Sequence, residues 1–75
     1  MSVEGYAYIT DDGTIDIKTV SATETAVMVN AIVTVSGHSI IPMYDWNEEK
    51  IREEFSRLLE LHGGRLAKVV ISVKE

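Results

Sequence analysis

The stretch GYAYITDDGTIDIKTV, residues 5–20, decides the fold because it encodes two strands and the turn between them. Residues 5–10 combine aromatic and β-forming side chains with a period of two, and residues 14–20 alternate in the same way. The Asp-Asp-Gly at residues 11–13 suits a tight turn, since glycine accepts positive φ and aspartate hydrogen-bonds nearby backbone groups. The stretch therefore predicts a β-hairpin.

The second strand of this hairpin carries two kinds of side chain in alternation. Ile15 and Ile17 fall on one side of the strand, and Asp16 and Lys18 fall on the other. Successive side chains of a strand point to opposite faces of the sheet. We therefore expect a hairpin whose Asp16 and Lys18 face is in water and whose isoleucine face is turned away from water.

Residues 22–36 are open to two interpretations. Ser21 and Glu24 match a capping box, and Gly37 is placed to end a helix about fifteen residues long. The alternative is a strand, because four valines also fit an alternating pattern: Val27, Val29, Val33 and Val35. We predict a helix here and keep the strand as the alternative.

A second helix is predicted after Asp45 or Asn47, either of which can cap it, and Gly63-Gly64 ends it. Glu48 and Glu49 lie in its first turn, where the helix dipole favours negative charge. The expected inward stripe consists of Ile51, Phe55, Leu58, Leu59 and His62. The expected outward ion pairs, four residues apart, are Glu48–Arg52 and Glu53–Arg57.

Two extended segments complete the pattern. Residues 38–43 predict a short piece that Pro42 limits to an edge, and residues 65–74 predict a last strand. Ala67, Val69, Ile71 and Val73 share one side of that strand. The expected fold is α+β: a single domain over 1–75, a two-layer sandwich with two helices covering a small sheet. The sheet combines the N-terminal hairpin with the C-terminal strand, in the order ββα(β)αβ.

Composition narrows the classes of partner. Seven basic and twelve acidic residues give a net charge of −5, which argues against nucleic acid or an anionic membrane as the main partner. The absence of cysteine excludes a disulfide or a thiolate metal site. No signal-peptide pattern opens the sequence and its longest apolar region is interrupted, so we expect a cytoplasmic protein.

Candidate chemistry is sparse in the sequence. Asp11, Asp12 and Asp16 could gather around a hard cation, but they lack a calcium-loop spacing, and turn aspartates usually stabilise the turn. His38 and His62 have no second ligand at metal-binding spacing. We predict no catalytic residue, no metal site and no cofactor.

Aromatic and methionine side chains are the remaining candidates for function. Such residues are enriched where proteins bind other proteins. The alternative assigns the tyrosines to the core and Trp46 to a hydrophobic staple on Ile51. The candidate partner-binding residues are Tyr6, Tyr8, Met43, Tyr44 and Trp46.

The first forty residues resemble a family of small, uncharacterised proteins of similar length encoded by bacteriophages and prophages of proteobacteria. The resemblance is carried by Gly5-Tyr6-Ala7-Tyr8-Ile9, Asp12-Gly13-Thr14-Ile15-Asp16, Thr19-Val20-Ser21, Thr23, Ala26 and Val29-Asn30. It implies a phage-related accessory protein that binds a host or phage protein, inside a bacterial host, and it transfers no functional residue.

Together these patterns predict a non-enzymatic protein that acts by binding another protein. An inhibitor of a host defence complex is one form of that function. The alternative is a structural protein that forms a homo-oligomer, such as a homodimer, through its aromatic surface or a sheet edge. A small enzyme is the third and least favoured interpretation.

Overall fold

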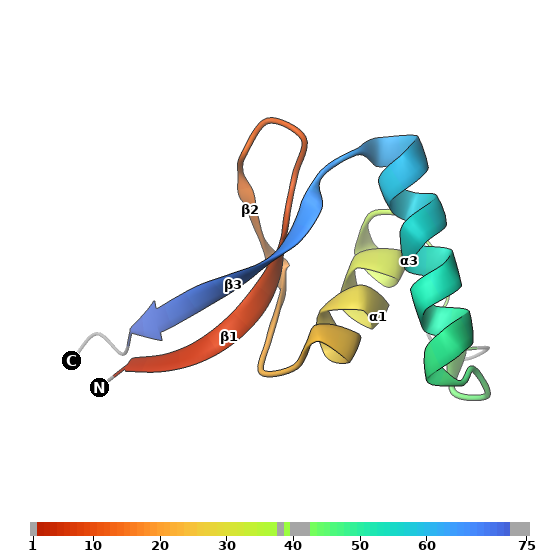
Figure 1. Cartoon of the computed structure of the whole chain (residues 1–75), viewed down its shortest axis with the longest axis horizontal. Helices are drawn as coiled ribbons and strands as arrows, with labels where there is room; N and C mark the ends of the chain where they lie inside the picture. The colour runs from red at the N-terminus through yellow and green to blue at the C-terminus, as the bar shows by residue number, and fades with distance from the viewer. Residues whose placement is uncertain (1, 38, 40–42, 73–75) are drawn as a thin grey trace.

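A three-stranded sheet and two helices make up the structure, a computed structural model that describes residues 2–37, 39 and 43–72. The elements are β1 (Ser2–Ile9), β2 (Ile15–Ser21), α1 (Glu24–Thr34), α3 (Glu48–His62) and β3 (Arg65–Ser72), as Figure 1 shows. This order confirms the predicted α+β fold. The short extended piece expected at 38–43 falls mostly on residues outside the described part of the chain.

β1 is the central strand of the sheet, whose order is β2-β1-β3 with both pairings antiparallel. Its pairing with β3 is unbroken from Ser2↔Ser72 to Ile9↔Arg65. The half of this β1–β3 ribbon that holds residues 2–5 and 69–72 extends beyond the helices (Figure 1). We call it the far half of the ribbon.

The pairing of β1 with β2 is short and interrupted. Tyr6 pairs with Ser21 and Tyr8 pairs with Asp16. An advance of two residues along β1 therefore corresponds to an advance of five residues along β2. The side chain of Thr19 restores the missing ladder contacts. Its Oγ1 accepts the Tyr8 N–H at 2.9 Å and its hydroxyl donates to the Asp16 carbonyl at 2.7 Å. β2 is therefore a bulged edge strand held by a buried hydroxyl.

Thr19→Val keeps the shape of this side chain and removes the hydroxyl. The Tyr8 N–H loses its partner in a buried setting, so we expect the free energy of unfolding to fall by about 1–3 kcal/mol. Thr34→Val is the matched control, because its hydroxyl donates to the Asn30 carbonyl at an exposed position. Urea denaturation of both variants measures the difference, and equal losses would contradict the role given to Thr19.

Residues 24–34 form the predicted helix, and the alternative strand is wrong. Its buried side chains follow a helical spacing: Val27, Met28, Ala31 and Ile32. The predicted capping box is also wrong, because Ser21 still belongs to β2. Thr23 caps the helix instead, and its Oγ1 accepts the Ala26 N–H at 3.2 Å.

The predicted second helix is confirmed as α3, with Asn47 as its cap: Asn47 Oδ1 accepts the Lys50 N–H at 2.8 Å. Ile51, Phe55 and Leu58 are buried on its inner face as expected. His62 is exposed, contrary to the prediction, because it lines an open hollow at the last turn of the helix.

Ion pairs line the outer face of α3. Arg52 contacts Glu48 at 3.1 Å, as predicted. Arg57 contacts Glu54 at 3.2 Å and not Glu53, because Glu54 also accepts Lys50 at 3.0 Å and anchors a three-residue cluster. The Arg52–Glu48 pair is exposed on both sides and contributes little to stability, whereas the Glu54 side chain is only 10% exposed.

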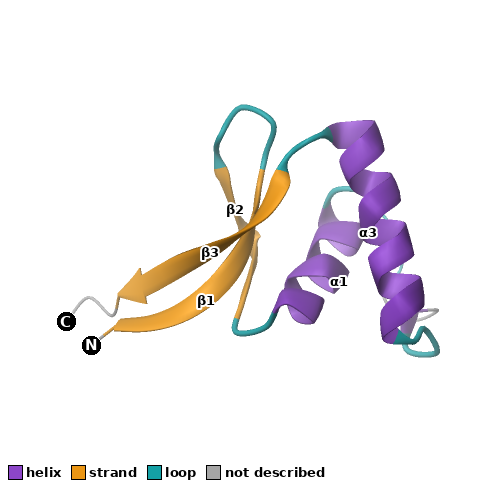
Figure 2. Cartoon of the chain, in the orientation of Figure 1, coloured by secondary structure: helices purple, strands orange, loops and turns teal. Residues whose placement is uncertain are grey.

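The core lies between the sheet and the helices, which share one side of the sheet (Figure 2). The Phe55 ring of α3 reaches the sheet and packs edge-on against Tyr8, with ring centres 6.3 Å apart. The core cluster is Tyr8, Val27, Met28, Ala31, Ile32, Met43, Ile51, Phe55 and Leu58. The isoleucine face of β2 does not join it, contrary to expectation: Ile17 is 82% exposed because the bulge starts there.

Candidate functional site

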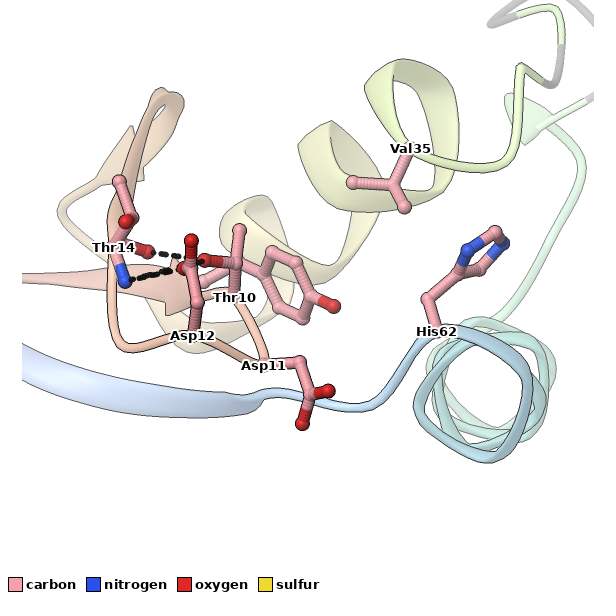
Figure 3. A pocket seen from close by; sticks show the side chains of 7 residues that line it. Thr10, Asp11, Asp12, Thr14, Val35 and His62 are labelled. Atoms are coloured by element: carbon pink, nitrogen blue, oxygen red, sulfur yellow. Dashed lines mark hydrogen bonds between the residues drawn. The ribbon is translucent and has the colours of Figure 1, made fainter.

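A shallow hollow of about 560 Å³ lies beside the β1–β2 turn and the end of α3 (Figure 3). Figure 3 shows Asp12 and Thr14 on one side of it and Val35 and His62 on the other. The residues that line it are Tyr8, Thr10, Asp11, Asp12, Thr14, Val35 and His62.

Asp12 is engaged in closing the turn. Its carboxylate accepts the Thr10 hydroxyl and the Thr14 N–H, the latter at 3.1 Å. The hydrogen bond from Thr10, followed by those from Thr14, lowers the pKa of the Asp12 carboxyl below its usual value. These contacts are those of a turn that is held by its own side chains.

Tyr8 connects the hairpin to the end of α3. Its hydroxyl donates to the Gly63 carbonyl at 2.5 Å. Burial, followed by the negative charges of Asp11 and Asp16, raises the pKa of the Tyr8 phenol above its ordinary value. The phenol is therefore a neutral donor at neutral pH, and its bond to Gly63 fixes the position of β1 relative to the end of α3.

The predicted turn aspartates do not come together around a cation. Asp12 closes the turn, whereas the Asp16 carboxylate accepts the Lys18 N–H at 3.1 Å. Among the described residues, no group of three histidine, cysteine or acidic side chains is placed to hold a metal ion. Likewise, within the described ranges neither helix is long and apolar enough to cross a bilayer.

A second surface is the side of the sheet that faces away from the helices. Tyr8 of β1 points to the helical core, so the odd-numbered residues of β1 point the other way. Directly paired residues share a face, and the pairs on this face are Val3↔Ile71, Gly5↔Val69, Ala7↔Ala67, Ile9↔Arg65 and Ile9↔Ile15. We call this surface the open face and define it by Val3, Ile15, Val69 and Ile71.

Side-chain packing supports the assignment of these residues to the open face. A Cβ atom placed on Gly5 would lie 3.1 Å from Ile71 Cδ1, so the Ile71 side chain leans over Gly5 on the same face. Ala7 and Ile9 are buried, yet neither belongs to the cluster beneath the helices. The open face is thus an aliphatic strip whose exposed side chains are Val3 and Ile71 at one end and Ile15 at the other, with the buried Ala7 between them.

Exposed apolar side chains are concentrated on the sheet. Five of the seven large exposed apolar residues in the described chain lie on strands: Val3, Ile15, Ile17, Val70 and Ile71. The other two, Tyr44 and Leu61, lie in a loop and on α3. The sheet is therefore the most apolar accessible surface among the described residues.

The five predicted partner-binding residues do not form one surface. Tyr8 is 2% exposed and, like Met43, belongs to the core cluster. Tyr6 and Trp46 are half-buried and pack against that cluster, with the Lys50 ammonium 5.4 Å from the Trp46 ring. Only Tyr44 among the five lies mainly in solvent, at 78% exposure.

No protein-family profile, curated protein or solved structure significantly matches this chain. The resemblance to phage proteins therefore stays a prediction.

Sequence reasoning missed the open face, although β3 carried a signal for it. Residues 66–71 are apolar on both faces of the strand, apart from Lys68. Strands with apolar residues on both faces are typically covered on both faces. The helices cover only one side of the sheet. The apolar residues on the other side of β3 therefore indicate a surface suited to contact with another protein.

Proposed function

We propose that this protein is a non-enzymatic binding module that docks on another protein through the open face of its sheet. The observation that carries the proposal is that three exposed aliphatic side chains, Val3, Ile15 and Ile71, lie on this face of the sheet. Contiguous apolar surface on a folded protein is typical of interaction sites. A sheet also holds such side chains in fixed positions, which lowers the entropy lost on binding.

The charge pattern of the open face specifies the chemistry of the partner. Arg65 pairs with Ile9 and therefore shares the open face, whereas Glu4 and Lys68 lie on the opposite face. The face thus combines aliphatic side chains with a guanidinium in a protein of net charge −5. We infer a partner that presents an apolar patch with a carboxylate at its rim.

The phage resemblance of residues 5–40 supports an accessory role in which the partner is a host or phage protein. Inhibition of a host defence complex is one form of that role. The partner-binding assignment of Tyr44, an exposed residue in the turn before α3, also stays a proposal.

Val3→Glu tests the proposed docking surface. A carboxylate in the aliphatic strip would have to be buried without a partner, so we expect affinity to fall at least about tenfold, or 1.4 kcal/mol. The protein, tagged and folded, first captures its partner from a proteobacterial lysate, and calorimetry then compares the variants with that purified partner.

Leu61→Glu is the matched control, because Leu61 is equally apolar and is exposed on α3. It should bind like the unchanged protein. Equal losses in the two variants would contradict docking through the open face, and so would a folded bait that captures no stoichiometric partner.

A further inference from the structure

The two edges of the sheet differ in how they are protected. β2 is interrupted by the bulge and carries Asp16 and Lys18. β3 runs for eight residues in unbroken register with β1 and contains no proline and no bulge. In the described part of the chain, no strand pairs with its outer side. Natural edge strands normally carry protective features such as those of β2.

The far half of the ribbon makes the β3 edge still less protected than the β2 edge. Its β3 residues Val69, Val70 and Ile71 are β-branched and favour strand pairing. Val70 is 67% exposed, although it lies on the helix side, because the ribbon extends beyond the helices (Figure 1). Lys68 is the nearest charge, and it contacts Glu4 of β1 at 3.3 Å. A two-stranded ribbon uncovered on both faces is only marginally stable in water.

We propose that the outer edge of β3 pairs with the same edge of a second copy of this chain. Antiparallel pairing about a two-fold axis joins the two sheets into one of six strands. The free N–H and C=O groups of each edge then bond to each other. The proposal does not depend on the proposed function, because the edge pairs through backbone N–H and C=O groups and the open face binds through side chains, although Val69 and Ile71 belong to both.

The edge of β3 is self-complementary in shape and charge, which favours a second copy as its occupant. With the axis at Val70, the two Val70 side chains meet, and Val69 lies opposite Ile71 of the partner subunit. Lys68 then lies opposite Ser72 of the partner subunit, so no like charges face each other across the pair.

The remaining charges are compatible with this arrangement. Glu4, the acidic residue of the far half, contacts Lys68, and five of the twelve acidic residues lie on α3, at the opposite end of the molecule from the far half of the ribbon (Figure 1). Over such a separation, salt screens most of the repulsion between two copies. A two-fold axis perpendicular to the sheet also keeps both open faces on one side, where they form a larger apolar surface.

Val70→Lys tests the pairing. Two introduced ammonium groups meet at the axis, so we expect the dimer dissociation constant to rise by about tenfold or more. Ile17→Lys is the matched control, because Ile17 is an exposed aliphatic residue on the other edge strand. Sedimentation equilibrium over a concentration series measures both constants, and circular dichroism checks that each variant is folded.

Concentration-dependent dimerisation that weakens in Val70→Lys and is unchanged in Ile17→Lys supports the proposal. A protein that stays monomeric throughout the series, or equal weakening in the two variants, overturns it. Val3→Glu separates the two proposals, because it changes the open face and should leave the dimer intact.

Discussion

Replacing Leu58 with alanine should remove a large part of the stability of this protein. Leu58 is 1% exposed and lies in the core cluster with Tyr8 and Phe55. Truncating a buried leucine loses its apolar contacts and leaves a cavity, at a cost of about 2–5 kcal/mol. Small domains are at the lower end of the usual range of about 5–15 kcal/mol for the free energy of unfolding. The expected loss is therefore close to the total stability of the protein.

Leu61→Ala is the comparison that isolates burial as the cause. Leu61 lies on the same helix one turn later, and it is 75% exposed. Alanine is the better helix former, so we expect this variant to stay within about 0.5 kcal/mol of the unchanged protein. Thermal and urea unfolding followed by circular dichroism measure both variants. Similar midpoints for the two would show that α3 does not pack as described.

Gly64→Ala should produce a second large loss. Gly64 has a φ of +87°, a backbone conformation that side chains with a Cβ disfavour. A Cβ there would also collide with the Ile9 carbonyl oxygen and lie 2.7 Å from the Tyr8 hydroxyl. Left-handed strain and overpacking together cost about 2–5 kcal/mol. The collision with the main chain cannot be relieved by a change of rotamer.

Gly13→Ala separates the two contributions. Gly13 has nearly the same φ, +89°, but no atom outside its immediate neighbours lies within 4 Å of the added Cβ. It should therefore show only the backbone cost, about 1–2 kcal/mol. Urea denaturation of the pair gives the cost of the close approach by difference. If both variants lose the same amount, the junction between α3 and β3 is more open than the structure shows.

The parts of the fold that depend on neighbouring residues were predictable from the sequence. The turn at residues 11–13 fixes the hairpin, and Asn47 with Gly63 fixes α3, because caps and turns act over three or four positions. The error at Ser21 has a non-local cause. The bulge in β2 uses up extra residues before the strand ends, which moves the helix start to Thr23.

The candidate surfaces were less predictable because they also depend on contacts between segments far apart in the sequence. Alternation shows that Tyr6 and Tyr8 share a side of β1, but it does not show which side the helices cover. That depends on contacts between distant segments, such as Phe55 on Tyr8. Once the helices are placed, the same alternation assigns Val3 and Ile71 to the open face, and the apolar residues on both sides of β3 are the local signal for it.

The position of β1 between β2 and β3 determines the order of events in folding. β1 and β2 are adjacent in the chain and can pair early, whereas Ser2 pairs with Ser72, which is far from it in the sequence. Non-local pairing is slow because loop-closure entropy must be lost before the contacts form. We therefore expect the strand that carries the proposed dimer edge to pair last, so that assembly follows the folding of the rest of the domain.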